Sequence, residues 1–166
     1  QDCARSLMRS TGVEARIPLQ YGLKAQLGAQ GGVLFPGGAL EDATAYAQER
    51  RQFGQAIGEF QNTRFRLSRM ATEIEAARQL MYYVCDEIDQ KRRCDKEAAM
   101  VKFFASEMAE RVTSEALQIF GGAGYTTLHA VERYWRDARL TKIFEGTSEI
   151  QQRIISDHLL GKPKAA

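Results

Sequence analysis

Two long stretches with apolar residues at spacings of three and four constrain the fold of this chain most. The first runs from about Asn62 to Gln90 and the second from Lys96 to Phe120. This spacing places the apolar side chains on one face of an α-helix. Only Arg92 to Cys94 separates the two stretches, and Asp95 can cap the second helix. The expected inward residues of the first are Leu67, Met70, Ala71, Ile74, Ala77, Leu80, Met81, Val84 and Ile88, and those of the second are Val101, Phe104, Ala105, Met108, Val112, Ala116 and Ile119.

Three further segments are helical by composition or spacing. Ala39 to Phe53 is rich in alanine, and Gly54 is a natural residue just after a helix end. Shorter helices are expected over Leu128 to Arg136 and Ser148 to Leu160. No segment alternates apolar and polar residues as a strand does. The fold predicted is therefore all-α, an antiparallel up-and-down helical bundle over residues 39–166.

Residues 1–38 contain too many glycines and prolines for a long helix, and we expect an irregular N-terminal arm there. The 166 residues suffice for one domain with a substantial core. A net charge of +2 gives no electrostatic reason to expect binding to nucleic acid or to acidic membranes. Three cysteines without ligand spacing and only two histidines favour no metal site and a reducing, cytoplasmic setting.

The stretch from Ile143 to Gln152 reads as a tight turn followed by a helix start. Thr147 or Ser148 can cap that helix, and Glu149 then lies in its first turn, where an acid is favoured. Ile150, Ile154 and Ile155 should dock one apolar face of it. Gly146 permits positive φ and a close approach of the backbone to another group.

Glu145 therefore stands on a bend beside apolar Phe144 and not on a solvated helix face. A carboxylate held there can be kept partly dry, which would raise its pKa toward that of a useful base. The simpler interpretation is that a glutamate before a glycine is an ordinary solvated turn residue.

Two other clusters have both a structural and a functional interpretation. Arg50 to Gly54 can be a basic helix end, where cations offset the helix dipole. Gln118 to Tyr125 can be a glycine-rich helix end. It is not a Walker or Rossmann phosphate loop, because no strand precedes it and no lysine follows in register.

Taken together, Ala39–Gly54, Gln118–Tyr125 and Ile143–Gln152 resemble the C-terminal domain of the acyl-CoA dehydrogenases, in the family's order and spacing. Residues Phe144 to Ser148 match the family's Tyr/Phe-Glu-Gly-Thr-Ser motif, whose glutamate removes the α-proton of an acyl-CoA thioester. The resemblance thus implies that Glu145 is the catalytic base. It also implies that Phe144 and Gly146 border the substrate, since bulk at Gly146 would crowd the acyl chain.

The same resemblance implies an FAD site. Arg50, Gln52 and Phe53 match the family's Arg-x-x-Phe-Gly segment, which would contact the phosphate and ribose groups of FAD in a neighbouring subunit and pack on the cofactor. The family's glycine-rich turn would lie against the pyrophosphate, and other positions would contact FAD in the same subunit. The remaining implied FAD residues are Gln61, Gln118, Gly121, Gly122, Thr147 and Glu149, the last being glutamine in many family members.

The function implied is oxidation of acyl-CoA to trans-2-enoyl-CoA, with electrons passed to an electron-transfer flavoprotein. A homo-oligomer, dimer or tetramer, in the bacterial cytoplasm or the mitochondrial matrix would be expected. Family enzymes also have an N-terminal helical domain and a middle β-domain, so these 166 residues alone should be incomplete. The alternative is a non-catalytic assembly module or partner subunit derived from the family.

Overall fold

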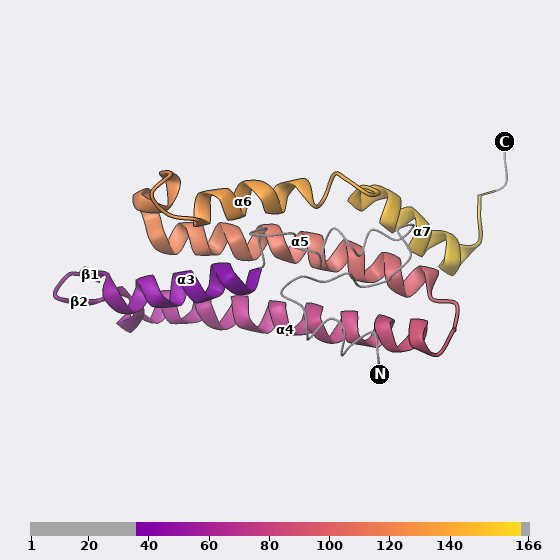
Figure 1. Ribbon diagram of the computed structural model, residues 1–166, viewed down its shortest axis with the longest axis horizontal. Coiled ribbons are helices and arrows are strands. Elements are labelled where there is room, and N and C mark those ends of the chain that lie inside the picture. Colours follow the sequence, from indigo (N-terminus) through magenta and orange to yellow (C-terminus); the bar gives the residue numbers. More distant parts are fainter. Residues whose placement is uncertain (1–35, 164–166) are drawn as a thin grey trace. The chain divides into compact units, whose positions relative to one another are not determined.

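The computed structural model describes residues 36–163, and Figure 1 shows their course. The described part is almost entirely helical, which confirms the all-α prediction, and its single sheet is a hairpin of two short strands. In chain order the elements are α3 (Pro36–Glu49), β1 (Arg51–Gln52), β2 (Gln55–Ala56), η2 (Ile57–Glu59), α4 (Gln61–Asp89), α5 (Asp95–Phe120), η3 (Gly121–Tyr125), α6 (Val131–Leu140) and α7 (Ser148–Leu160).

The described residues divide into two compact units, and α4 and α5 each contribute to both. The turn unit comprises residues 77–107 and 140–163, and the hairpin unit comprises residues 36–76 and 108–139. Each unit is described by itself below.

In the turn unit, the end of α4 and the start of α5 form an antiparallel pair. The polypeptide reverses at Lys91, which has a φ of 56°, and Arg92 N–H donates to the Glu87 carbonyl at 2.9 Å. An apolar cluster contains residues of both helices and of the reversal: Met81, Val84, Cys85, Cys94, Ala98 and Val101. The predicted antiparallel packing is confirmed here. It follows from the inward spacing of these residues on both sides of a short turn.

In the hairpin unit, ion pairs join the first half of α4 to the second half of α5. Glu73 accepts from Arg111 at 3.0 Å, and Arg66 pairs with Glu115 further along, as an antiparallel arrangement requires. At the end of α5, the ring of Phe120 stacks on Tyr46 of α3 with centroids 4.1 Å apart. Three alanines of α3 are buried at spacings of four: Ala39, Ala43 and Ala47.

The first helix differs from its predicted bounds of Ala39 to Phe53. It begins at Pro36, where the fixed φ of proline suits a first helical turn, and it ends at Glu49. The expected arm over residues 1–38 thus contributes its last three residues to α3, and the rest of it lies outside the described residues. Arg50 N–H still donates to the Tyr46 carbonyl, but the chain then turns into β1.

Phe53 and Gly54 connect β1 to β2 in a two-residue turn, with φ values of 53° and 85° and with Gln52 opposite Gln55. Positive φ at both central residues is typical of a tight hairpin, for which glycine is favoured. The prediction that Gly54 ends a helix was therefore wrong, because a glycine at positive φ suits a hairpin turn as well as a helix end.

The other helices follow their predicted bounds more closely. α4 and α5 differ from them by at most one residue at each end, and α7 has the predicted bounds. α6 begins three residues later than expected and ends four later, because Gly121–Tyr125 forms a 3₁₀ turn and the loop after it extends to Ala130. Ala71, expected to face inward, is exposed.

Candidate functional site

The polypeptide between α6 and α7 forms a tight turn that carries the predicted base. The N–H groups of Ile143 and Phe144 both donate to the Leu140 carbonyl, at 2.9 and 3.2 Å. Glu145 and Gly146 then adopt φ values of 52° and 95°. Two successive residues with positive φ thus bend the backbone sharply just before α7.

Thr147 caps α7, as one of the two predicted alternatives. Its Oγ1 accepts from the Ile150 N–H at 3.4 Å, and its carbonyl accepts from the Gln151 N–H at 3.0 Å. Ser148 is the first helical residue and is buried. A side-chain cap of this kind typically contributes about 1 kcal/mol to helix stability. It also fixes where α7 begins relative to Glu145.

Gly146 is required by a contact within the chain. The buried side chain of Gln151 donates from Nε2 to the Gly146 carbonyl at 3.2 Å. A Cβ on residue 146 would lie 2.6 Å from that nitrogen. The predicted positive φ and close backbone approach are thus confirmed, and the group approached is Gln151.

Glu145 itself is exposed in the described structure, and Phe144 is half-buried. The expectation of a partly dry carboxylate was therefore wrong for the described residues. The physical reason is that Ser148 and Gln151 are the residues of this segment that point inward and are buried. The apolar face expected on α7 is also incomplete, since Ile150 is 44% exposed while Ile154 and Ile155 are half-buried.

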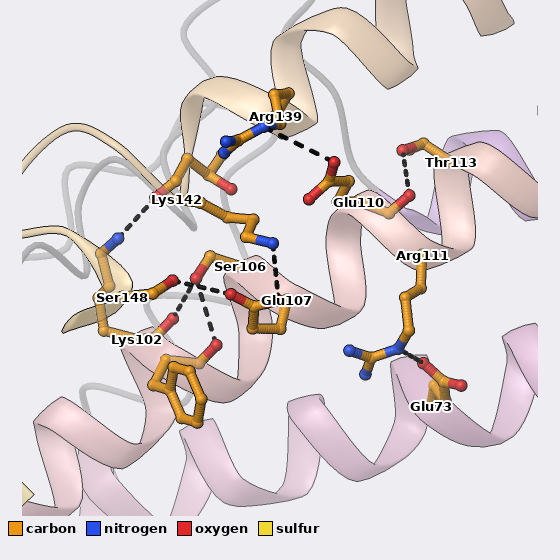
Figure 2. A network of polar contacts seen from close by, with 12 residues as sticks. Glu73, Lys102, Ser106, Glu107, Glu110, Arg111, Thr113, Arg139, Lys142 and Ser148 are labelled. Atoms are coloured by element: carbon orange, nitrogen blue, oxygen red, sulfur yellow. Dashed lines mark hydrogen bonds and ion pairs between the residues drawn. The ribbon is translucent and has the colours of Figure 1, made fainter. Parts of the chain in front are cut away.

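A polar network on α5 supports this turn, and no sequence motif marked it. Lys102 is buried, and its Nζ donates to the Thr141 carbonyl at 2.5 Å. Glu107 accepts from Ser148 Oγ at 2.8 Å and pairs with Lys142 at 2.8 Å (Figure 2). The sequence did contain one signal for this network, which is that Lys102 follows Val101, a predicted core residue. A charged residue at a core position needs a buried partner.

The hairpin unit carries the predicted Arg50 segment on its surface. Arg50, Gln52 and Phe53 are exposed, and the Phe53 ring is 93% exposed. Phe53 also has a positive φ, which is unfavourable for a bulky residue. Its ring is edge-on to Phe60, with centroids 6.3 Å apart. The hairpin therefore presents an aromatic ring at its tip, beside a guanidinium group and an amide.

The three glycines Gly121, Gly122 and Gly124 after α5 differ in why the structure needs a glycine at each position. Gly124 is buried, and a Cβ there would lie 2.7 Å from the Phe120 Cβ and 2.9 Å from the Leu117 carbonyl oxygen. Gly121 has a φ of 61°, so its backbone favours glycine, but no described atom lies within 4 Å of the place of its Cβ. Gly122 does not have a positive φ, and no described atom outside its immediate chain neighbours lies within 4 Å of the place of its Cβ.

The remaining predicted residues complete two sets, one in each unit. Gln61 is exposed at the start of α4, and Gln118 is exposed in the last turn of α5. The hairpin unit thus contains Arg50, Gln52, Phe53, Gln61, Gln118, Gly121 and Gly122, and the turn unit contains Phe144, Glu145, Gly146, Thr147 and Glu149.

The chemistry of the hairpin-unit set fits a dinucleotide. A guanidinium group pairs with phosphate oxygens in a planar fork, and amides hydrogen-bond to ribose and phosphate. The open space at Gly121 and Gly122 leaves their backbone accessible to a ligand. Among residues 36–163, no group of three or more histidine, cysteine or acidic side chains could hold a metal ion. No helix in that range is both long and apolar enough to cross a membrane.

The chain is similar to known proteins over most of its length. Residues 29–160 match the family described as acyl-CoA dehydrogenase, C-terminal domain. A subunit of the caffeyl-CoA reductase–Etf complex, CarC of Acetobacterium woodii, is 47% identical over 125 residues, which are 75% of this chain and 33% of the relative.

Two solved structures extend the likeness to the fold. Butyryl-CoA dehydrogenase from Megasphaera elsdenii matches with a TM-score of 0.77 and 38% identity, over 86% of this chain and 35% of that one. An FAD complex of PigA matches with a TM-score of 0.73 and 34% identity, over 77% of this chain and 33% of that one. The chain spans about a third of the length of these relatives.

Proposed function

The chain belongs to the acyl-CoA dehydrogenase family through its C-terminal domain, and on that premise we propose that it is the catalytic and oligomerisation domain of an FAD-dependent acyl-CoA dehydrogenase. The observation that carries the proposal is the turn at Glu145 and Gly146. A glutamate held at positive φ, next to a glycine whose own φ of 95° disfavours any other residue, is a strained arrangement. Such strain is concentrated at functional sites.

Glu145 is the proposed base. One of its carboxylate oxygens accepts the α-proton of the acyl-CoA thioester as the Cα–H bond breaks and the Cα–Cβ double bond forms. A donor on the thioester carbonyl makes that proton more acidic. By resemblance to the family, the backbone N–H of Glu145 is such a donor. The fixed turn and the Thr147 cap would then position both the base and the donor.

FAD is the proposed cofactor, and when bound it would supply the acceptor for the hydride that leaves the β-carbon. Arg50, Gln52 and Gln118 of this chain would hold its phosphate and ribose groups, and Gly121 and Gly122 would allow their backbone to approach the pyrophosphate. Phe53 would pack on the cofactor. The exposure of these side chains in the hairpin unit and the likeness to PigA, which was solved as an FAD complex, support this proposal.

Because the hairpin-unit residues resemble those that contact FAD of a neighbouring subunit, we propose a homo-oligomer in which each subunit completes its neighbour's site. The exposed Phe53 ring at the tip of the hairpin, 93% exposed, is available for contact in such an assembly. An electron-transfer flavoprotein is the proposed electron acceptor, which the name of the Acetobacterium woodii relative supports.

The same relative favours a second candidate, reduction of an enoyl-CoA thioester. The residues would keep their places and the reaction would run backward. A hydride would be added to the β-carbon, and protonated Glu145 would give its proton to the α-carbon. Which direction dominates depends on the electron partner, because one base serves both directions by microscopic reversibility.

The test is the substitution Glu145→Gln in the full-length protein. Glutamine has nearly the same shape but cannot accept the α-proton. We expect the variant to retain FAD while anaerobic acyl-CoA reduces the flavin about 10²–10⁴-fold more slowly than in the wild type. The measurement is stopped-flow absorbance of the flavin with acyl-CoA thioesters of several chain lengths.

Glu41→Gln is the matched control, because it removes one exposed carboxylate from α3 and should leave the rate of flavin reduction unchanged. Two results with the wild type would together favour the reductase. No acyl-CoA would bleach its oxidised flavin, and an enoyl-CoA would oxidise its reduced flavin. Absence of FAD from the full-length protein would instead favour the non-catalytic assembly module.

A further inference from the structure

The largest fully buried side chain of the described residues belongs to a lysine, Lys102 on α5, which is 1% exposed. Its ammonium group is close to the turn between α6 and α7, and Nζ donates to the Thr141 carbonyl at 2.5 Å (Figure 2). Burying an ammonium group costs several kcal/mol unless it is paired or hydrogen-bonded. Such a residue in a core of alanine, valine and methionine therefore calls for a specific role.

Glu107, five residues along the same helix, holds the other end of this turn. Its Oε2 accepts from Lys142 Nζ at 2.8 Å, and its Oε1 accepts from Ser148 Oγ at 2.8 Å. The Ser148 N–H donates to the Lys142 carbonyl at 3.2 Å, which closes the turn on itself. Residues 141–148 are thus attached to α5 at both ends, and Glu145 stands between the attachments.

Two carboxylates act on the charge of Lys102. Burial lowers the pKa of the Lys102 ammonium group, while the Glu145 and Glu107 carboxylates act in the opposite direction. Lys142, the other cation beside the turn, is paired with Glu107.

We propose that Lys102 is a positioning residue for Glu145: its hydrogen bond to the Thr141 carbonyl fixes the turn and thereby the place of the Glu145 carboxylate. The proposal rests on the proposed function of Glu145 as the base. Lys102 makes no contact with substrate in this role. It acts by deciding where the carboxylate stands.

The test is Lys102→Met in the full-length, flavin-loaded protein, since methionine keeps an unbranched side chain and removes the charge and the donor. We expect reduction of the flavin by acyl-CoA to become about ten- to a hundredfold slower, because a carboxylate that is no longer held in place meets the α-proton less often. The KM for acyl-CoA should change less than about twofold, since Lys102 does not touch the substrate. A merely structural role would lower the flavin content or the stability and would not slow reduction at an unchanged KM.

Lys96→Met is the matched control. It removes a lysine from the first turn of the same helix, where Lys96 pairs with Glu97 at 3.1 Å, and it should leave the rate of flavin reduction unchanged. Lys102→Arg retains the charge and a donor for the Thr141 carbonyl, so it should recover most of the rate that Lys102→Met loses. This variant decides the matter if Lys102→Met loses its flavin.

Hydrogen exchange separates the two proposals. Amides of residues 141–147 should exchange faster in Lys102→Met than in the wild type, whether or not the protein oxidises acyl-CoA. If acyl-CoA does not reduce the wild-type flavin but exchange is still faster in Lys102→Met, the proposed dehydrogenase function is rejected. The attachment of the turn by Lys102 is then still supported. An unchanged rate of flavin reduction and unchanged exchange in Lys102→Met would overturn the role of Lys102.

Discussion

Positive φ at non-glycine residues is the feature that most distinguishes the site at the scale of single residues. Within residues 36–163 it occurs at Phe53, Lys91 and Glu145, and two of these three are predicted site residues. Each costs about 1–2 kcal/mol relative to an ordinary conformation. Lys91 is explained by the reversal between α4 and α5, whereas Phe53 and Glu145 are held in turns that display them to solvent.

Gly146→Ala tests how the turn is fixed. The substitution forces a φ of 95° on alanine and places its Cβ 2.6 Å from Gln151 Nε2. Gln151 is buried, so it cannot move aside without losing its hydrogen bond to the Gly146 carbonyl. We expect a loss of about 1–2 kcal/mol from the backbone and about 1 kcal/mol more from this displacement.

Gly54→Ala is the control for the backbone contribution, because Gly54 has a φ of 85° and no described atom within 4 Å of its Cβ position. Chemical denaturation of the purified protein measures both free energies of unfolding. Equal losses of unfolding free energy in the two variants would mean that the Gln151 side chain moves aside at no cost. The contact between Gln151 and Gly146 would then not fix the turn.

At the scale of the element, the glycine-rich turn after α5 combines two different requirements. Gly124 is needed for packing, because Phe120 and Leu117 occupy the space of its side chain. Nothing in the described residues requires glycine at position 122, which is exposed. A glycine that the fold does not need is a candidate for contact with a ligand.

The pair Gly124→Ala and Gly122→Ala separates these requirements. The first should lose about 1–3 kcal/mol of stability, as overpacked cores do. The second should leave the free energy of unfolding unchanged within about 0.5 kcal/mol and weaken FAD binding to the full-length protein. Denaturation curves and flavin fluorescence titrations measure the two effects. Unweakened FAD binding in Gly122→Ala would remove this residue from the proposed site.

The sequence predicted the long elements well and the short ones poorly. Spacings of three and four over more than twenty residues leave little choice of structure, so α4 and α5 agree with their predicted bounds within one residue. Gly54 was compatible with both a helix end and a hairpin, and only the tertiary fold selects the hairpin. The proposed site residues come from motif resemblance. Lys102 had no such signal, since its partner is a backbone carbonyl 39 residues away.

At the scale of the whole molecule, stability should depend on pH through a buried thiol. Cys94 is 8% exposed in the apolar cluster between α4 and α5. Burial raises the pKa of its thiol above the ordinary value of 9.0, and the acidic neighbours Glu97 and Asp95 act in the same direction. In the unfolded chain the thiol ionises near its ordinary pKa.

The sign of the effect follows from proton linkage. Above about pH 9 the unfolded state binds fewer protons than the folded state, so the free energy of unfolding falls as pH rises toward the folded-state pKa. We expect Cys94→Ala to lose this dependence, which has a slope of at most about 1.4 kcal/mol per pH unit. Denaturant unfolding at about pH 7, 8, 9.5 and 10 measures the difference between wild type and variant.

That difference should be constant between about pH 7 and pH 8, where the thiol is neutral in both states, and this range serves as the internal control. A difference that stays constant up to about pH 10 would show that the thiol of Cys94 titrates normally in the folded protein.

The sequence by itself determined the all-α class, the antiparallel pairing of the two long helices, the family and the turn that carries Glu145. These depend on local information: apolar periodicity, a capping hydroxyl, and a glycine next to a glutamate. The tertiary structure decided what holds that turn. The attachments made by Lys102, Glu107 and Gln151 depend on which groups packing brings within hydrogen-bond distance, and residues far apart in the chain leave no local pattern for such contacts.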